Sequence, residues 1–117
     1  MSQPRRFVIL LHQTPKEEHW DVMLETDSAL KTWSIPPQCP TGLSFTRPAK
    51  RLPDHRKHYL DYEGEVADNR GTLARIDTGL YTQLLSGQYN LFGTHFLGKL
   101  TVETGWMVFE KSFREVF

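Results

Sequence analysis

The sequence has a single cysteine and no long hydrophobic run, and both absences narrow the class of protein. Cys39 alone forms no internal disulfide and provides no cysteine-based zinc site, so we expect a reducing, cytoplasmic setting. The apolar stretch from Phe7 to Leu11 is too short for a membrane span or for the hydrophobic region of a signal peptide. We therefore expect no membrane partner.

Net charge is also lacking, because 14 basic residues balance 14 acidic ones. Electrostatic steering of the whole molecule toward nucleic acid is therefore weak. The basic segment from Arg47 to His58, RPAKRLPDHRKH, departs from this balance and is interpreted either as a solvated loop or as a local phosphate-binding patch. No P-loop, GxSxG, HExxH, CxxC or GxGxxG motif is present, so nucleoside-triphosphate hydrolysis and serine-based hydrolysis have no support.

Short runs with alternating or continuous apolar residues, separated by turn residues, dominate the chain. With 117 residues it has the size of one domain, and we expect a single domain over residues 1–117. Residues 38–53 are expected to form a long proline-rich loop. Strands are expected at 7–11, 19–25, 30–35, 59–66, 72–76, 79–84, 88–93, 95–102 and 106–111. This pattern predicts an all-β, mainly antiparallel protein, a compact β-barrel or rolled sheet.

Histidines gather in two short clusters that lie far apart in the sequence. His19 and Asp21 stand two residues apart in a predicted half-buried strand, so their side chains share a face. His12 follows the first apolar run, and His55 precedes the next predicted strand. If these side chains meet, they form a nitrogen and oxygen pocket suited to a divalent transition metal. The alternative for each is an ordinary exposed or hydrogen-bonded histidine.

The ordered strings FVILLHQTPKEEHWDVMLE, LKTWSIP and KRLPDHRKHYLDYEGE resemble a known family. They are similar to the 3′-phosphoesterase domain of bacterial ATP-dependent DNA ligase D, the end-joining ligase. The resemblance covers roughly residues 5–65, and DTGLY and FLGKLTVETGWMVFEK echo the later strands of the family. It implies a compact β-barrel and a manganese-dependent activity that removes 3′-phosphates and 3′-ribonucleotides from nucleic-acid ends.

The resemblance also implies a role for individual residues. The metal ligands of the family fall on His12, Asp21 and His55, and its catalytic histidine and tyrosine fall on His19 and Tyr59. The phosphate-binding arginine falls on Arg51, with Arg47 as the alternative. The implied cofactor is Mn²⁺, with Zn²⁺ and Co²⁺ as alternatives that the same ligands accept.

Met23 stands where the family pattern has an arginine, and Pro37 stands where it has a lysine. Because methionine makes no charge-assisted bonds to phosphate, a second interpretation is a domain that binds metal or a nucleic-acid end without turnover. A third is hydrolysis of a small phosphodiester. The partners implied are nucleic-acid 3′ ends and, in trans, ligase or polymerase components of end joining.

Overall fold

Antiparallel strands make up nearly all of the regular structure. The computed structural model describes residues 4–38 and 41–112, so Cys39 lies outside the described residues. Its elements are β1 (Arg5–Gln13), β2 (Glu18–Glu25), β3 (Leu30–Ile35), β4 (Phe45–Pro48), β5 (Lys50–His55), the 3₁₀ helix η1 (Lys57–Leu60), β6 (Gly64–Glu65), β7 (Thr72–Gln83), β8 (Gln88–Gly93), β9 (Leu97–Glu103) and β10 (Trp106–Lys111). The Cα radius of gyration is 13.9 Å, close to the roughly 13 Å of a compact domain of about 100 residues.

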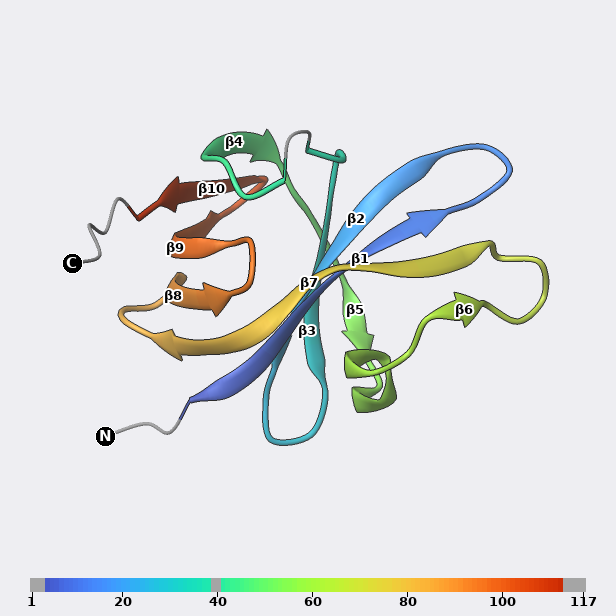
Figure 1. Cartoon of the computed structure of the whole chain (residues 1–117), viewed down its shortest axis with the longest axis horizontal. Coiled ribbons are helices and arrows are strands. Elements are labelled where there is room, and N and C mark those ends of the chain that lie inside the picture. The colour runs from blue at the N-terminus through green and yellow to red at the C-terminus, as the bar shows by residue number, and fades with distance from the viewer. Residues whose placement is uncertain (1–3, 39–40, 113–117) are drawn as a thin grey trace.

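The strands form one curled sheet. Its order is β4-β10-β9-β8-β7-β1-β2-β3-β5, and β6 pairs with β7. Strands β4 and β5 stand at opposite ends of this order, yet only Ala49 separates them in the chain. The sheet therefore curls until its ends approach each other, with the long strands β1, β2 and β7 crossing its middle (Figure 1). The predicted antiparallel barrel is confirmed.

Strand β2 is buried on both faces, so the prediction of a half-buried strand is wrong. Trp20, Val22 and Leu24 belong to the main core. Met23 points to the opposite face and belongs to a second cluster with Val8, Leu10, Leu30, Leu60 and Leu73. This second cluster forms because η1 supplies a buried leucine against β1 and β2. Polar groups on the outer face of these strands are consequently shielded from solvent by η1 and the second cluster.

Half of the segment 38–53 is not an irregular loop, as the sequence predicted, because β4 and the first part of β5 occupy it. Pro48 lies in β4 and Pro53 in β5, and each of these strands pairs on one side only. Proline is tolerated there because an edge strand does not need every backbone N–H for the sheet. The proline-rich loop is confined to residues 36–44, of which 39–40 lie outside the described part.

Two further predictions of strands are corrected. Residues 59–66 contain the end of η1 and the short β6 rather than one strand. Residues 72–83 form the single strand β7 rather than two strands, with Ile76 as an extra residue opposite β1. Asp77 lies in the expected gap between those two strands, but it belongs to β7, and its buried carboxylate accepts backbone hydrogen bonds from residues 94–96 in the β8–β9 turn. The strands at 30–35, 88–93 and 106–111 are confirmed with their bounds unchanged.

Candidate metal centre

The register of β1 and β2 places the first histidine cluster on one face of the sheet. His12 lies directly opposite His19, and Leu10 lies opposite Asp21. Directly opposed residues of antiparallel strands point to the same side, so His12, His19 and Asp21 share the outer face. The imidazole rings of His12 and His19 are 4.8 Å apart between centroids. The expected sharing of a face by His19 and Asp21 is thus present, and His12 joins them.

The Asp21 carboxylate is buried among these histidines and is incompletely paired. Its residue is only 3% exposed, and Oδ1 has no hydrogen-bond partner. The Nε2 atom of His19 lies 3.1 Å from Oδ1, and the Nδ1 atom of His12 lies 3.7 Å from Oδ2. Burial raises the pKa of Asp21, and the neighbouring positive charges of His19, His12 and His55 oppose that rise. The imidazole of His19 approaches Oδ1 without hydrogen-bond geometry, so this buried oxygen is a position that a cation would satisfy.

Backbone carbonyls orient two of the imidazoles. The Nε2 atom of His12 is 2.6 Å from the carbonyl oxygen of Arg70, and the Nδ1 atom of His55 is 2.9 Å from that of Pro53. A carbonyl only accepts, so each of these nitrogens carries a proton, and the other ring nitrogen is the one that can offer a lone pair to a metal. Such carbonyl contacts fix the tautomer and orientation of metal-binding histidines.

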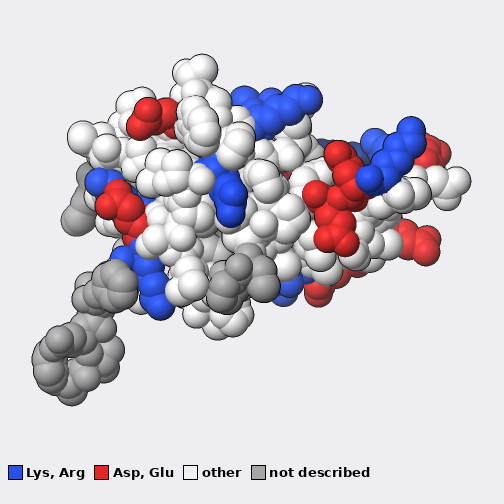
Figure 2. Space-filling view, turned by 90° about the horizontal axis from the view of Figure 1, so that it is seen from above, with Lys and Arg blue, Asp and Glu red and all other residues white. Residues whose placement is uncertain are grey.

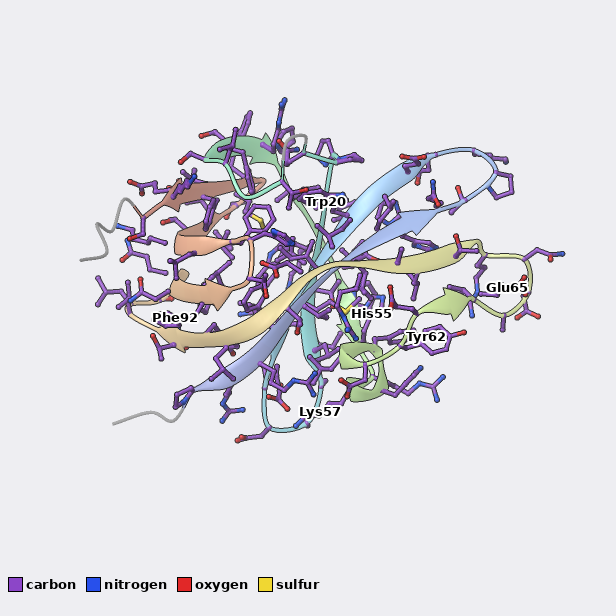
Figure 3. The ribbon with its side chains drawn as sticks, in the orientation of Figure 1. Trp20, His55, Lys57, Tyr62, Glu65 and Phe92 are labelled. Carbon is purple, nitrogen blue, oxygen red and sulfur yellow. The ribbon has the colours of Figure 1, made fainter. Side chains whose placement is uncertain are left out.

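His55 and Tyr59 approach the cluster from a different part of the chain. His55 ends β5, and Tyr59 lies on η1, so the 3₁₀ helix rather than a strand presents the tyrosine. A cavity of about 100 Å³, which we call the outer pocket, is lined by His12, Asp21, Met23, His55, Tyr59, Val66, Arg70 and Leu73. Figure 3 shows His55 beside η1, near the crossing of the long strands.

The donor set fits a divalent transition metal. Among the described residues, His12, His19 and Asp21 form a group whose nitrogen and oxygen atoms all lie within 4.8 Å of one another. Two imidazoles and one carboxylate suit Zn²⁺, Mn²⁺ and related ions. The sequence assigned the third ligand to His55 and a catalytic role to His19. The structure gathers His12, His19 and Asp21 most tightly and places His55 on the wall of the outer pocket.

The two arginines predicted to bind phosphate do not line the outer pocket. Arg51 lies opposite Trp33, on the other face of the sheet, with its guanidinium carbon 5.2 Å from the centre of that ring. It donates to Asp54 at 2.8 Å and lines a separate cavity of about 360 Å³. Arg47 donates to the Gln38 side chain at 2.9 Å.

Arg70 is the arginine at the outer pocket, and the sequence analysis missed it. It supplies the carbonyl that accepts from His12, 58 residues away in the chain, and it lines the cavity. The residue types Asp68, Asn69 and Gly71 are typical of a turn, and in the structure all three have positive φ angles, +96° at Gly71. No spacing pattern connects this turn with His12, since only the pairing of β1 with β7 brings them together.

The surface charge around this end of the molecule is mixed. Figure 2 shows several Asp and Glu side chains toward the end where the β1–β2 hairpin and β6 lie in Figure 1. The Glu17 carboxylate is 3.7 Å from Nδ1 of His19. An anionic ligand would therefore depend on a bound cation at the cluster to offset nearby negative charge.

Comparison with known proteins gives a consistent result. Residues 11–111 match the family described as the DNA Ligase D 3′-phosphoesterase domain. The multifunctional non-homologous end joining protein LigD of Pseudomonas aeruginosa is 28% identical over a match that covers 69% of this chain and 12% of that protein. The protein of the same name from Mycobacterium bovis is 30% identical, over 64% of this chain and 10% of the relative. The chain thus spans about a tenth of the length of these relatives.

Proposed function

The chain belongs to the DNA ligase D 3′-phosphoesterase domain family, and we propose that it is a metal-dependent phosphoesterase that removes a 3′-phosphate or a 3′-ribonucleotide from nucleic-acid ends. The observation that carries this proposal is the buried, incompletely paired carboxylate of Asp21 between His12 and His19. A structural core has no need of such a group, whereas a metal-dependent phosphoesterase does.

The metal would be held by His12 and Asp21 together with His55 or His19. Mn²⁺ is the ion we propose, and Zn²⁺ and Co²⁺ fit the same donors. When bound, the metal supplies positive charge that polarises the phosphate for attack. The chain itself contributes the orientation of the ligands, through the carbonyl oxygens that accept from His12 and His55.

His19 and Tyr59 are the residues that would handle protons and phosphate oxygens. His19 lies between the carboxylates of Asp21 and Glu17 and would protonate the leaving sugar oxygen. Tyr59 lines the outer pocket, and its hydroxyl has no hydrogen-bond partner among the described residues, so it can donate to a phosphate oxygen. We assign Arg51 and Arg47 to phosphates away from the reacting one, because neither lines the outer pocket.

The family and its relatives support the setting that we propose for this activity. We propose that residues 1–117 act as a single domain in the cytoplasm on nucleic-acid 3′ ends. The LigD relatives are named for non-homologous end joining, so ligase or polymerase components of that process are the partners we propose in trans. Within residues 4–38 and 41–112, no helix has the length and hydropathy needed to cross a membrane.

Met23 favours a second candidate, a domain that binds nucleic-acid ends without turnover. Its side chain lines the outer pocket beside Asp21 and is 1% exposed. It therefore offers an apolar surface where an arginine would neutralise a phosphate. Arg70 is the only arginine or lysine among the described residues that line the outer pocket.

The experiment is an end-processing assay with the purified chain and Mn²⁺. The substrates are 5′-labelled primers that end in a 3′-phosphate or a single ribonucleotide, and products are separated on a gel. We expect release by the wild type and a loss of about 100-fold or more in the His55→Ala variant. The control is His95→Ala, which removes an exposed histidine from the β8–β9 turn.

Two outcomes decide between the candidates. Release no faster than in His55→Ala or in a chelator would contradict catalysis. Tight binding of the 3′-phosphate end without release, followed by activity in Met23→Arg, would support the non-catalytic domain instead.

A further inference from the structure

Three aromatic side chains next to the outer pocket form a continuous surface, which we call the aromatic shelf: His58, Tyr59 and Tyr62. The rings of His58 and Tyr59 are 4.0 Å apart between centroids and tilted by 36°. Tyr62 meets both of them edge-on, at 5.9 Å from His58 and 6.0 Å from Tyr59. The shelf therefore presents tilted and edge-on rings from one short segment of chain.

The shelf begins at the outer pocket and leads away from it. Tyr59 lines the pocket, and its ring is 5.8 Å from that of His55. His58 is the outermost member and is exposed, whereas Tyr59 and Tyr62 are partly buried. In Figure 3 Tyr62 lies on the β6 side of His55, over the stretch between η1 and β6. A group bound at His55 would thus have an aromatic neighbour within reach.

Packing of the core explains only part of this arrangement. Leu60 is the buried residue of η1, and it anchors the helix in the second core cluster. Tyr59 and Tyr62 pack against the edge of that cluster. His58 adds no such burial, because it is exposed and its ring rests on Tyr59. An exposed imidazole that stacks beside a catalytic pocket is a surface suited to a planar ligand.

The segment that carries the shelf is held in place by its own contacts. The guanidinium of Arg6 donates to the Asp61 carboxylate at 2.7 Å and to the carbonyl oxygen of Leu60 at 3.5 Å. The hydroxyl of Tyr62 donates to the carbonyl oxygen of Glu65. These contacts fix η1 before any ligand arrives, so binding would lose little conformational entropy.

We propose that the aromatic shelf is a nucleobase subsite that stacks the terminal base of a single-stranded or frayed 3′ end. This inference rests on the proposed function, because it places the 3′-phosphate of that nucleotide in the outer pocket. Stacking on aromatic rings accepts every base, since each base has a π-face. The subsite consequently selects an unpaired terminal nucleotide and not a sequence.

The test is direct binding of short oligonucleotides that end in a 3′-phosphate, measured by fluorescence anisotropy without any need for turnover. One oligonucleotide carries a terminal base and the other is abasic at that position. We expect the wild type to bind the base-bearing end about 5- to 100-fold more tightly. His58→Ala should remove most of this preference and leave binding of the abasic end unchanged. His58→Phe should restore it, and His95→Ala should match the wild type.

The subsite and the proposed activity fail in different ways. Equal affinity for the two ends, or equal weakening of both by His58→Ala, would overturn the subsite even if the chain removes 3′-phosphates. Base-dependent binding that His58→Ala abolishes, without product formation, would uphold the subsite and contradict the proposed turnover. Turnover of both ends with the same KM would likewise overturn the subsite and leave the activity intact.

Discussion

Replacement of Asp21 by asparagine should make the metal-free protein more stable and remove its response to metal. Asp21 is 3% exposed, and its Oδ1 atom lacks a hydrogen-bond partner. Burial opposes ionisation of this carboxyl, which is why its pKa is raised despite the histidines around it. Asparagine keeps the shape of the side chain and removes the negative charge, so the variant avoids burying an ion.

The size of both effects follows from the burial. An unsatisfied buried polar group costs about 1–3 kcal/mol, and the partial compensation from His12 and His19 reduces this. We therefore expect Asp21→Asn to gain about 1–2 kcal/mol without metal, which corresponds to a rise in Tm of roughly 4–8 °C for a domain of this size. A metal at 100 times its Kd would stabilise the wild type by about 2.7 kcal/mol, and the variant would gain almost nothing.

The assay is thermal unfolding of both proteins in a chelator and in saturating Mn²⁺ or Zn²⁺. The order of stability should reverse between the two conditions. Asp68→Asn is the control, because Asp68 is exposed and has a φ of 62°, a conformation that asparagine adopts equally well. A metal-free Asp21→Asn protein that is less stable than the wild type, or an equal metal response of both, would refute the reasoning.

Two other substitutions test the turn at the outer pocket and the pH dependence of stability. Gly71 has a φ of +96°, and a Cβ there would overlap the carbonyl oxygen of Gln13. Gly71→Ala should therefore destabilise the fold by about 1–3 kcal/mol. It should also weaken metal binding about 10- to 100-fold, because it displaces the carbonyl that orients His12. Calorimetric titration checks this against Gly105→Ala, where nothing lies within 4 Å of the added carbon. Burial raises the pKa of Tyr81, so the folded state keeps a proton that the unfolded state loses above about pH 10, and stability should fall there as pH rises. In Tyr81→Phe this fall should be smaller, and the missing hydrogen bond should cost about 1 kcal/mol at pH 7. Urea unfolding at pH 7 and above pH 10 measures both effects, and an equal fall of stability with pH in the two proteins would contradict the reasoning.

Local patterns in the sequence were enough to predict the strand type and the sharing of a face by His19 and Asp21. Alternation with period two is a property of the strand itself, so it needs no knowledge of the partner strand. The same reasoning failed for Tyr59, because the residue types around it are compatible with the start of a strand as well as with the 3₁₀ helix that forms. It also failed at Asp77, in the expected gap between two strands, because this residue lies within β7 and its carboxylate accepts hydrogen bonds from the β8–β9 turn.

The sequence by itself therefore determined the all-β class, the family and the candidate metal-binding residues. Only the tertiary structure decided which of them meet. The register of β1 with β2 sets His12 against His19, and η1 brings Tyr59 and the aromatic shelf to the same pocket. Strand pairings between residues far apart in the chain decide that Arg51 lies on the other face of the sheet and that Arg70, instead, lies at the outer pocket. Such pairings minimise the unpaired backbone and the exposed apolar area of the whole sheet. That total depends on all strands together, so no local segment of sequence determines it.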